Sequence, residues 1–193
     1  LSFVSPHTKE QVTVNEGIAH FLEHKMFENE SGIDSLMALM SLGLDANAYT
    51  TNDHTAYLFS GTENFYEGLD ELMDYVQHPY YTDENVEKER PIIGQEIGKY
   101  DDMPPWKLYI NAVQNMYHNN TVRIDTAGTV ETISHITKEN LYSCYNTFYN
   151  PANSIMCISG DFNPEEIINE IKKRLIQKEK ITSITRIYPE EPE

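Results

Sequence analysis

Basic side chains are scarce in this chain of 193 residues. Only 14 Lys and Arg residues stand against 31 Asp and Glu residues, which gives a formal net charge of −17 at pH 7. Because nucleic-acid phosphates select surfaces rich in Lys and Arg, this balance argues against a nucleic-acid partner. An acidic surface is compatible with a basic substrate, although solubility is its commoner purpose.

Cysteine is also rare. Cys144 and Cys157 are the only two and do not form a C-x-x-C pair, which argues against a thiolate zinc site and a dithiol redox motif. A single disulfide stays open, but both residues have apolar neighbours, and a buried free thiol is the usual state there. This usage suits a reducing compartment, so we expect a cytoplasmic protein.

Long apolar runs are missing too. No stretch approaches the roughly 18 apolar residues of a transmembrane helix, so we expect no membrane partner. The first ten residues lack the basic start and apolar block of a signal peptide. The chain starts with Leu1 rather than Met, and Tyr188–Glu193 is typical of a connecting segment. We therefore expect a piece of a longer, multi-domain chain.

Apolar periodicity predicts an α+β fold. We expect a single N-terminal domain over residues 1–193, in which helices pack on an antiparallel sheet in two layers, because few strands are separated by single crossover helices. Residues 46–60 predict one long strand or a strand pair, and residues 154–159 predict a buried strand. Helices are predicted at about residues 15–27, 32–43, 62–76, 82–99, 104–116, near 130, 137–148 and 164–177.

Two local signals refine these helices. Thr13 and Glu16 have the spacing of a capping box, which predicts that the first helix begins directly after them. Pro91 falls inside the helix predicted at 82–99. Because proline removes a backbone donor, it should kink this helix or mark the junction of two helices.

The pentapeptide His20-Phe21-Leu22-Glu23-His24 carries the chemistry. Residues four apart lie on the same face of a helix, so His20 and His24 can bind one metal ion. Glu23 shares that face and can accept a proton from a metal-bound water. This H-x-x-E-H order is the inverzincin signature, although a pair of solvated surface histidines is the alternative.

A catalytic zinc needs a third protein ligand from another element and an open position for water. Glu96, on the helix predicted at 82–99, is the candidate. Glu89 lies two turns earlier on the same face and could hydrogen-bond a ligand histidine, which would orient its ring. The alternative for Glu89 is a surface carboxylate that pairs with Lys88 or Arg90.

Several motifs, in order along nearly the whole chain, resemble the pitrilysin/insulinase family of zinc metallopeptidases, in particular its bacterial branch similar to mitochondrial processing peptidases. Within that branch the similarity is greatest to a subfamily of Gram-positive bacteria. The segments that carry the resemblance are Gly17–Phe27, Asn47–Thr50, His54–Tyr57, Glu89–Ile97, Tyr100–Asp102, Ala127–Thr129, Tyr149–Asn153 and Gly160–Asp161.

The resemblance implies a mitochondrial-processing-peptidase-like domain and a zinc endopeptidase acting on peptides or unfolded protein segments. His20, His24 and Glu96 would bind Zn²⁺, Glu23 would be the general base, and Glu89 would support the site. Between His24 and Glu96 lie 71 residues (25–95), slightly fewer than in most members, which leaves Glu87 and Glu89 as alternative ligands.

The resemblance also implies partners. Residues Asn47, Ala48, Tyr49 and Thr50 would form a strand that pairs with an extended substrate, although Asn47 is equally typical of a strand end. The family closes as a clamshell, so a second half or a homologous subunit would complete the enzyme.

Two other functions compete with the peptidase. The chain could be a non-catalytic scaffold or heterodimer subunit, whose relatives typically lose at least one of the four key residues. A metal-storage module would need more ligands than the chain offers, because the other histidines lack ligand spacing: His7, His54, His78, His118 and His135.

Overall fold

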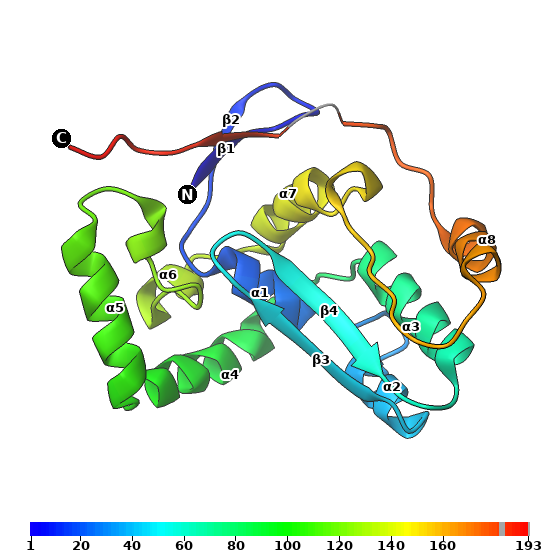
Figure 1. The fold of residues 1–193 in the computed structure, drawn as a ribbon. Helices are drawn as coiled ribbons and strands as arrows, with labels where there is room; N and C mark the ends of the chain where they lie inside the picture. The colour runs from blue at the N-terminus through cyan, green and yellow to red at the C-terminus, as the bar shows by residue number, and fades with distance from the viewer. Residues whose placement is uncertain (182–183, 193) are drawn as a thin grey trace.

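The computed structural model describes residues 1–181 and 184–192 (Figure 1). The helices are α1 (Ile18–Lys25), α2 (Ser35–Ser41), α3 (Phe65–Gln77), α4 (Asp83–Asp101), α5 (Pro104–Met116), α6 (Val130–Ser134), α7 (Lys138–Phe148) and α8 (Pro164–Arg174). The strands are β1 (Ser2–Val4), β2 (Gln11–Thr13), β3 (Asp45–Thr50), β4 (Thr55–Ser60) and β5 (Thr185–Ile187). Short 3₁₀ turns lie at Thr121–Arg123 and Pro151–Asn153.

The strands form two antiparallel sheets, as the predicted α+β class requires. Strand β1 pairs with β2 on one side and with β5 on the other. Strands β3 and β4 form a hairpin in which Asp45 is opposite Ser60 and Thr50 is opposite Thr55. The strand-pair alternative for residues 46–60 is therefore confirmed.

Helix α1 is the centre of the fold. It contacts α4, α7, β3 and β4, and in Figure 1 the hairpin crosses it, with α4 to α6 on one side and α3 and α8 on the other. Its apolar side chains Ile18, Phe21 and Leu22 are buried in the core. Because α1 is held from several directions, the side chains on its remaining face have fixed positions.

The predicted start of this helix is wrong. Thr13 does not cap α1 but ends β2, where it is opposite Ser2. Helix α1 begins instead after Gly17, whose φ of 88° lies in the left-handed region. A Cβ atom there would lie 2.6 Å from the carbonyl oxygen of Ala127, so the turn has room only for glycine.

Helix α4 runs through Pro91 without a break, which rules out the predicted junction of two helices. A capping box starts it: the Thr82 hydroxyl accepts a hydrogen bond from the Asn85 backbone N–H, and the Asn85 side chain accepts one from Thr82. The helix continues past Glu96 to Asp101.

The strand predicted at residues 154–159 is wrong. The segment pairs with no strand among the described residues, and Ile155 is 98% exposed. Cys157 is exposed rather than buried, whereas Cys144 is buried as expected, and both are free thiols. In the described part of the chain, no helix is long and apolar enough to cross a membrane.

Candidate metal centre

Two histidine rings stand together on the free face of α1. The ring centroids of His20 and His24 are 4.6 Å apart, as expected for side chains one helical turn apart. Their side chains are 12% and 24% exposed, so both face a recess rather than open solvent. The alternative of solvated surface histidines does not describe this pair.

Glu96 reaches the two rings from α4. Its Oε2 atom lies 3.6 Å from Nε2 of His20 and 3.3 Å from Nε2 of His24. Two ligands about 2.0–2.2 Å from a tetrahedral zinc are separated by roughly 3.3–3.6 Å. The three donor groups all approach within 4.8 Å of one another, and this is the one such group of three found among the described residues.

The alternative ligands point elsewhere. Glu87 is 64% exposed and forms an ion pair with Arg90. Glu89 is buried, and its Oε1 atom lies 3.0 Å from Nδ1 of His24, on the side of the ring away from Glu96. The alternative of a surface pair between Glu89 and a neighbouring base is wrong, because Lys88 instead pairs with Glu84.

Glu89 and His24 tune each other's pKa. Burial raises the pKa of Glu89, but the hydrogen bond with His24 and the charge of Lys25 outweigh it, and the net pKa is lowered. Burial lowers the pKa of His24, but Glu89 outweighs this effect and raises it overall. Burial and the neighbouring His24 lower the pKa of His20, which favours its neutral, metal-binding form.

Glu23 lies beside the three ligand candidates and outside their group. It is 7% exposed, and one of its carboxylate oxygens accepts a hydrogen bond from the hydroxyl of Thr50 on β3. Burial raises the pKa of Glu23, and the Thr50 hydrogen bond lowers it in part. A carboxylate with a raised pKa is the type of group that exchanges protons near neutral pH.

These groups share one cavity of about 610 Å³. Its walls include residues 47–50 of β3, which the sequence predicted as the substrate strand. Asn47 also lines the cavity, and its side-chain oxygen accepts a hydrogen bond from the Ala48 backbone N–H at 2.9 Å. The cavity is also lined by Glu89, Ile92, Tyr100, Trp106 and Asp125.

The sequence did not point to two residues that line this cavity, Trp106 and Asp125, or to Lys25 behind Glu89. Trp106 donates a hydrogen bond from Nε1 to Oδ2 of Asp125 at 2.8 Å, which ties α5 to the loop before α6. Lys25 is fully buried and lies 3.4 Å from Oε2 of Glu89. The signal for Lys25 was weak: it is a single base followed by the apolar pair Met26 and Phe27.

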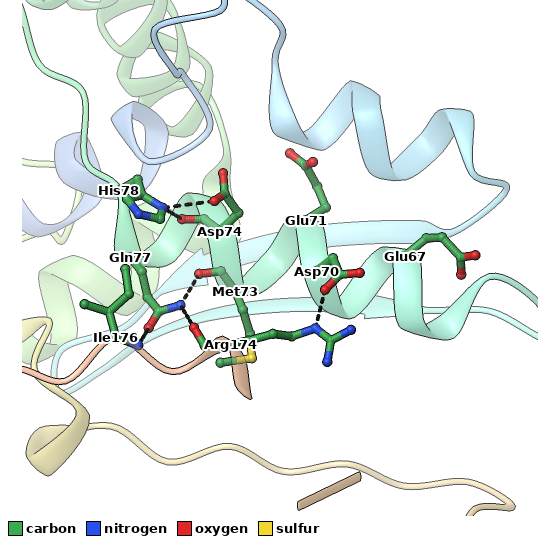
Figure 2. A pocket seen from close by; sticks show the side chains of 9 residues that line it. All are labelled: Glu67, Asp70, Glu71, Met73, Asp74, Gln77, His78, Arg174 and Ile176. Atoms are coloured by element: carbon green, nitrogen blue, oxygen red, sulfur yellow. Dashed lines mark hydrogen bonds and ion pairs between the residues drawn. The ribbon is translucent and has the colours of Figure 1, made fainter. Parts of the chain in front are cut away.

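A second hollow of about 560 Å³ lies between α3 and the segment after α8 (Figure 2). Several of its polar groups are paired with one another. Arg174 forms an ion pair with Asp70, and the Gln77 amide donates to the backbone oxygens of Met73 and Arg174. These contacts attach the end of α8 to α3, and the described residues offer no metal-binding group there.

Two helix histidines in H-x-x-E-H order and a glutamate from a second helix define the arrangement of an inverzincin-type metallopeptidase. The chain belongs to the insulinase family, peptidase family M16, whose model matches residues 9–130. A second model, the peptidase M16 inactive domain, matches residues 135–193. The family resemblance drawn from the motifs is therefore confirmed.

The relatives agree with this assignment. The chain is 52% identical over 171 residues to the uncharacterized zinc protease YmfH of Bacillus subtilis. The aligned region covers 89% of this chain and 40% of YmfH. This match agrees with the Gram-positive subfamily expected from the motifs. The chain is also 28% identical to a probable mitochondrial-processing peptidase subunit beta of Arabidopsis thaliana, over 81% of this chain and 30% of that protein.

Solved structures show the same fold. An M16-like peptidase of Alicyclobacillus acidocaldarius superposes with a TM-score of 0.92 at 44% identity, over 99% of this chain and 45% of that one. A Helicobacter pylori protease superposes with a TM-score of 0.80 at 22% identity and supports the fold alone. The chain thus spans less than half the length of these relatives.

Proposed function

We propose that this chain is the metal-binding domain of a zinc-dependent endopeptidase that cleaves peptides or unfolded protein segments. The observation that carries the proposal is the convergence of His20, His24 and Glu96, with Glu23 beside them in the same cavity. Three protein ligands that leave a position open are typical of catalytic rather than structural zinc. The names of the zinc-protease relatives support the choice of metal.

The donor set fits zinc, because two imidazoles and one carboxylate are ligands that this ion favours. His20 and His24 would bind it through Nε2, since both Nε2 atoms lie close to Glu96 and Glu89 already contacts Nδ1 of His24. When bound, zinc supplies a Lewis acid that polarises the scissile carbonyl and acidifies a water molecule. Glu23 accepts the proton of the attacking water and then delivers it to the leaving amine.

The substrate would add to β3 as an extended strand. Strand β3 pairs with β4 along one edge, and no strand among the described residues pairs with the other. The side-chain oxygen of Asn47 accepts a hydrogen bond from the Ala48 backbone N–H on that strand. An incoming peptide carbonyl would replace this oxygen as the acceptor. Main-chain pairing of this kind binds peptides of many sequences, which suits an enzyme for unfolded segments.

We further propose that residues 1–193 are one half of a longer, clamshell-like enzyme. The match to 40% of YmfH and 45% of the Alicyclobacillus peptidase supports this reading. The second half, or a homologous subunit, would close over the cavity and hold the substrate against β3. Closing an active site excludes water and strengthens the electrostatic interactions within it.

The metal content of matched variants tests the proposal. Elemental analysis of the purified chain should find about one zinc per chain in the wild type and in Glu87→Gln, whose carboxylate is exposed on the same helix. Glu96→Gln should lose most of the zinc. Equal zinc in Glu96→Gln and Glu87→Gln would refute the three-ligand site. Zinc binding without peptide cleavage by the longer protein would favour the non-catalytic subunit.

A further inference from the structure

Lys25 is a basic side chain with no exposed surface. Its relative exposure is 0%, and it is the one Lys or Arg that is buried in the described part of the chain. An ammonium group loses its hydration when it is buried, and this loss is compensated only by close ionic partners. Its position directly after His24 places those partners next to the metal centre.

The partners are two carboxylates. Nζ of Lys25 lies 3.4 Å from Oε2 of Glu89 on α4 and forms a second ion pair with Glu28. The other oxygen of Glu89, Oε1, lies 3.0 Å from Nδ1 of His24. Glu89 therefore has one oxygen on Lys25 and the other on His24, which fixes the plane of its carboxylate from both ends.

We propose that Lys25 is a positioning residue, a role that rests on the proposed function. It holds Glu89 so that Oε1 accepts the Nδ1 proton of His24 and Nε2 of that ring stays unprotonated, facing Glu96. Groups that orient ligand histidines contribute about 10- to 100-fold to metal affinity. Lys25 acts one contact further away, through Glu89, and does not itself touch the metal ligands' donor atoms.

The fixed orientation matters because, among the described residues, Lys25 and His24 are the two hydrogen-bond partners of the Glu89 side chain. Without Lys25 its carboxylate can rotate, and the His24 ring can then adopt the tautomer that places a proton on Nε2. Such a ring must lose this proton before it can bind a metal ion. The zinc affinity would fall although all three ligands remain in the chain.

A double-mutant cycle on the zinc dissociation constant tests this role. Lys25→Met should weaken zinc binding by about 10- to 100-fold, the range for groups that orient ligands. In a Glu89→Gln background the same substitution should have little further effect, because the group through which Lys25 acts is absent. Equal effects in both backgrounds would overturn the proposal, since interacting residues are non-additive. Lys88→Met, at an exposed lysine, is the matched control and should leave zinc affinity unchanged.

A second measurement needs no variant and tests the His24 tautomer on which the role of Lys25 depends, so it can refute the proposal even if Lys25→Met does not fold. The ¹⁵N NMR shifts of the His24 ring in the metal-free wild-type chain, recorded at a pH high enough to keep the ring neutral because Glu89 raises its pKa, should show the single proton on Nδ1. A proton mainly on Nε2 would overturn the proposal. A wild-type chain that binds no zinc would instead refute the proposed function, and the two failures are thus distinguishable.

Discussion

Gly17 is the position at which the fold can be tested most sharply. Its φ of 88° is left-handed, and a Cβ atom would lie 2.6 Å from the oxygen of Ala127 and 2.9 Å from Cγ2 of Ile133. A left-handed alanine costs about 1–2 kcal/mol. Forcing extra atoms into a packed site costs about 1–3 kcal/mol more. Gly17→Ala should therefore lower the free energy of unfolding by about 2–5 kcal/mol.

Gly43 provides the matched control. Its φ of 77° is also left-handed, but a Cβ atom there meets nothing within 4 Å. Gly43→Ala should therefore cost only the backbone strain of about 1–2 kcal/mol. Urea denaturation, followed by circular dichroism, measures both variants. Equal losses of stability in the two variants would refute the close contact between the start of α1 and Ala127.

Three further predictions concern the site and the thiols. Thr50→Val removes the hydrogen-bond donor to Glu23, so the pKa of Glu23 should rise further. Because the base must be ionised, the acid limb of peptide hydrolysis by the longer protein should move to higher pH. A lost hydrogen bond to a charged group, of about 1.5 kcal/mol, predicts a shift of about one pH unit. An unchanged pH profile would contradict this contact. Glu89→Gln should weaken zinc binding by about 10- to 100-fold in a chelator competition, and an unchanged affinity would show that the bond to His24 has no role. A thiol reagent should label Cys157 in the folded chain and spare Cys144, where burial raises the thiol pKa to about 12; rapid labelling of both would show that Cys144 is not buried.

The site could be predicted from the sequence largely because its geometry is local. His20, Glu23 and His24 lie within one turn of helix, and helical spacing alone places them together. Glu96 is distant in sequence, and its choice over Glu87 needed the family resemblance. The structure supplies the reason for this choice, since Glu96 faces the rings across the contact of α1 with α4.

The sequence-based predictions that were wrong concern contacts between distant segments. The start of α1 is set by Gly17 packing against Ala127, and no pattern near Thr13 reports that contact. The apolar residues 154–159 have the composition of a strand, but a strand also needs a neighbour to pair with. The described residues provide none, and Ile155 is left exposed. The role of Lys25 likewise depends on Glu89 of α4, which lies 64 residues away in the sequence.

The most direct test of the account is Glu23→Gln in the longer protein that carries this chain. Glu23 is the proposed base and lies outside the group of metal-ligand candidates. The variant should therefore retain about one zinc per chain. Its rate of peptide hydrolysis should fall by about 10²- to 10⁴-fold, the usual contribution of a general base. Hydrolysis at the wild-type rate with zinc retained would contradict the role of Glu23 and the mechanism built on it.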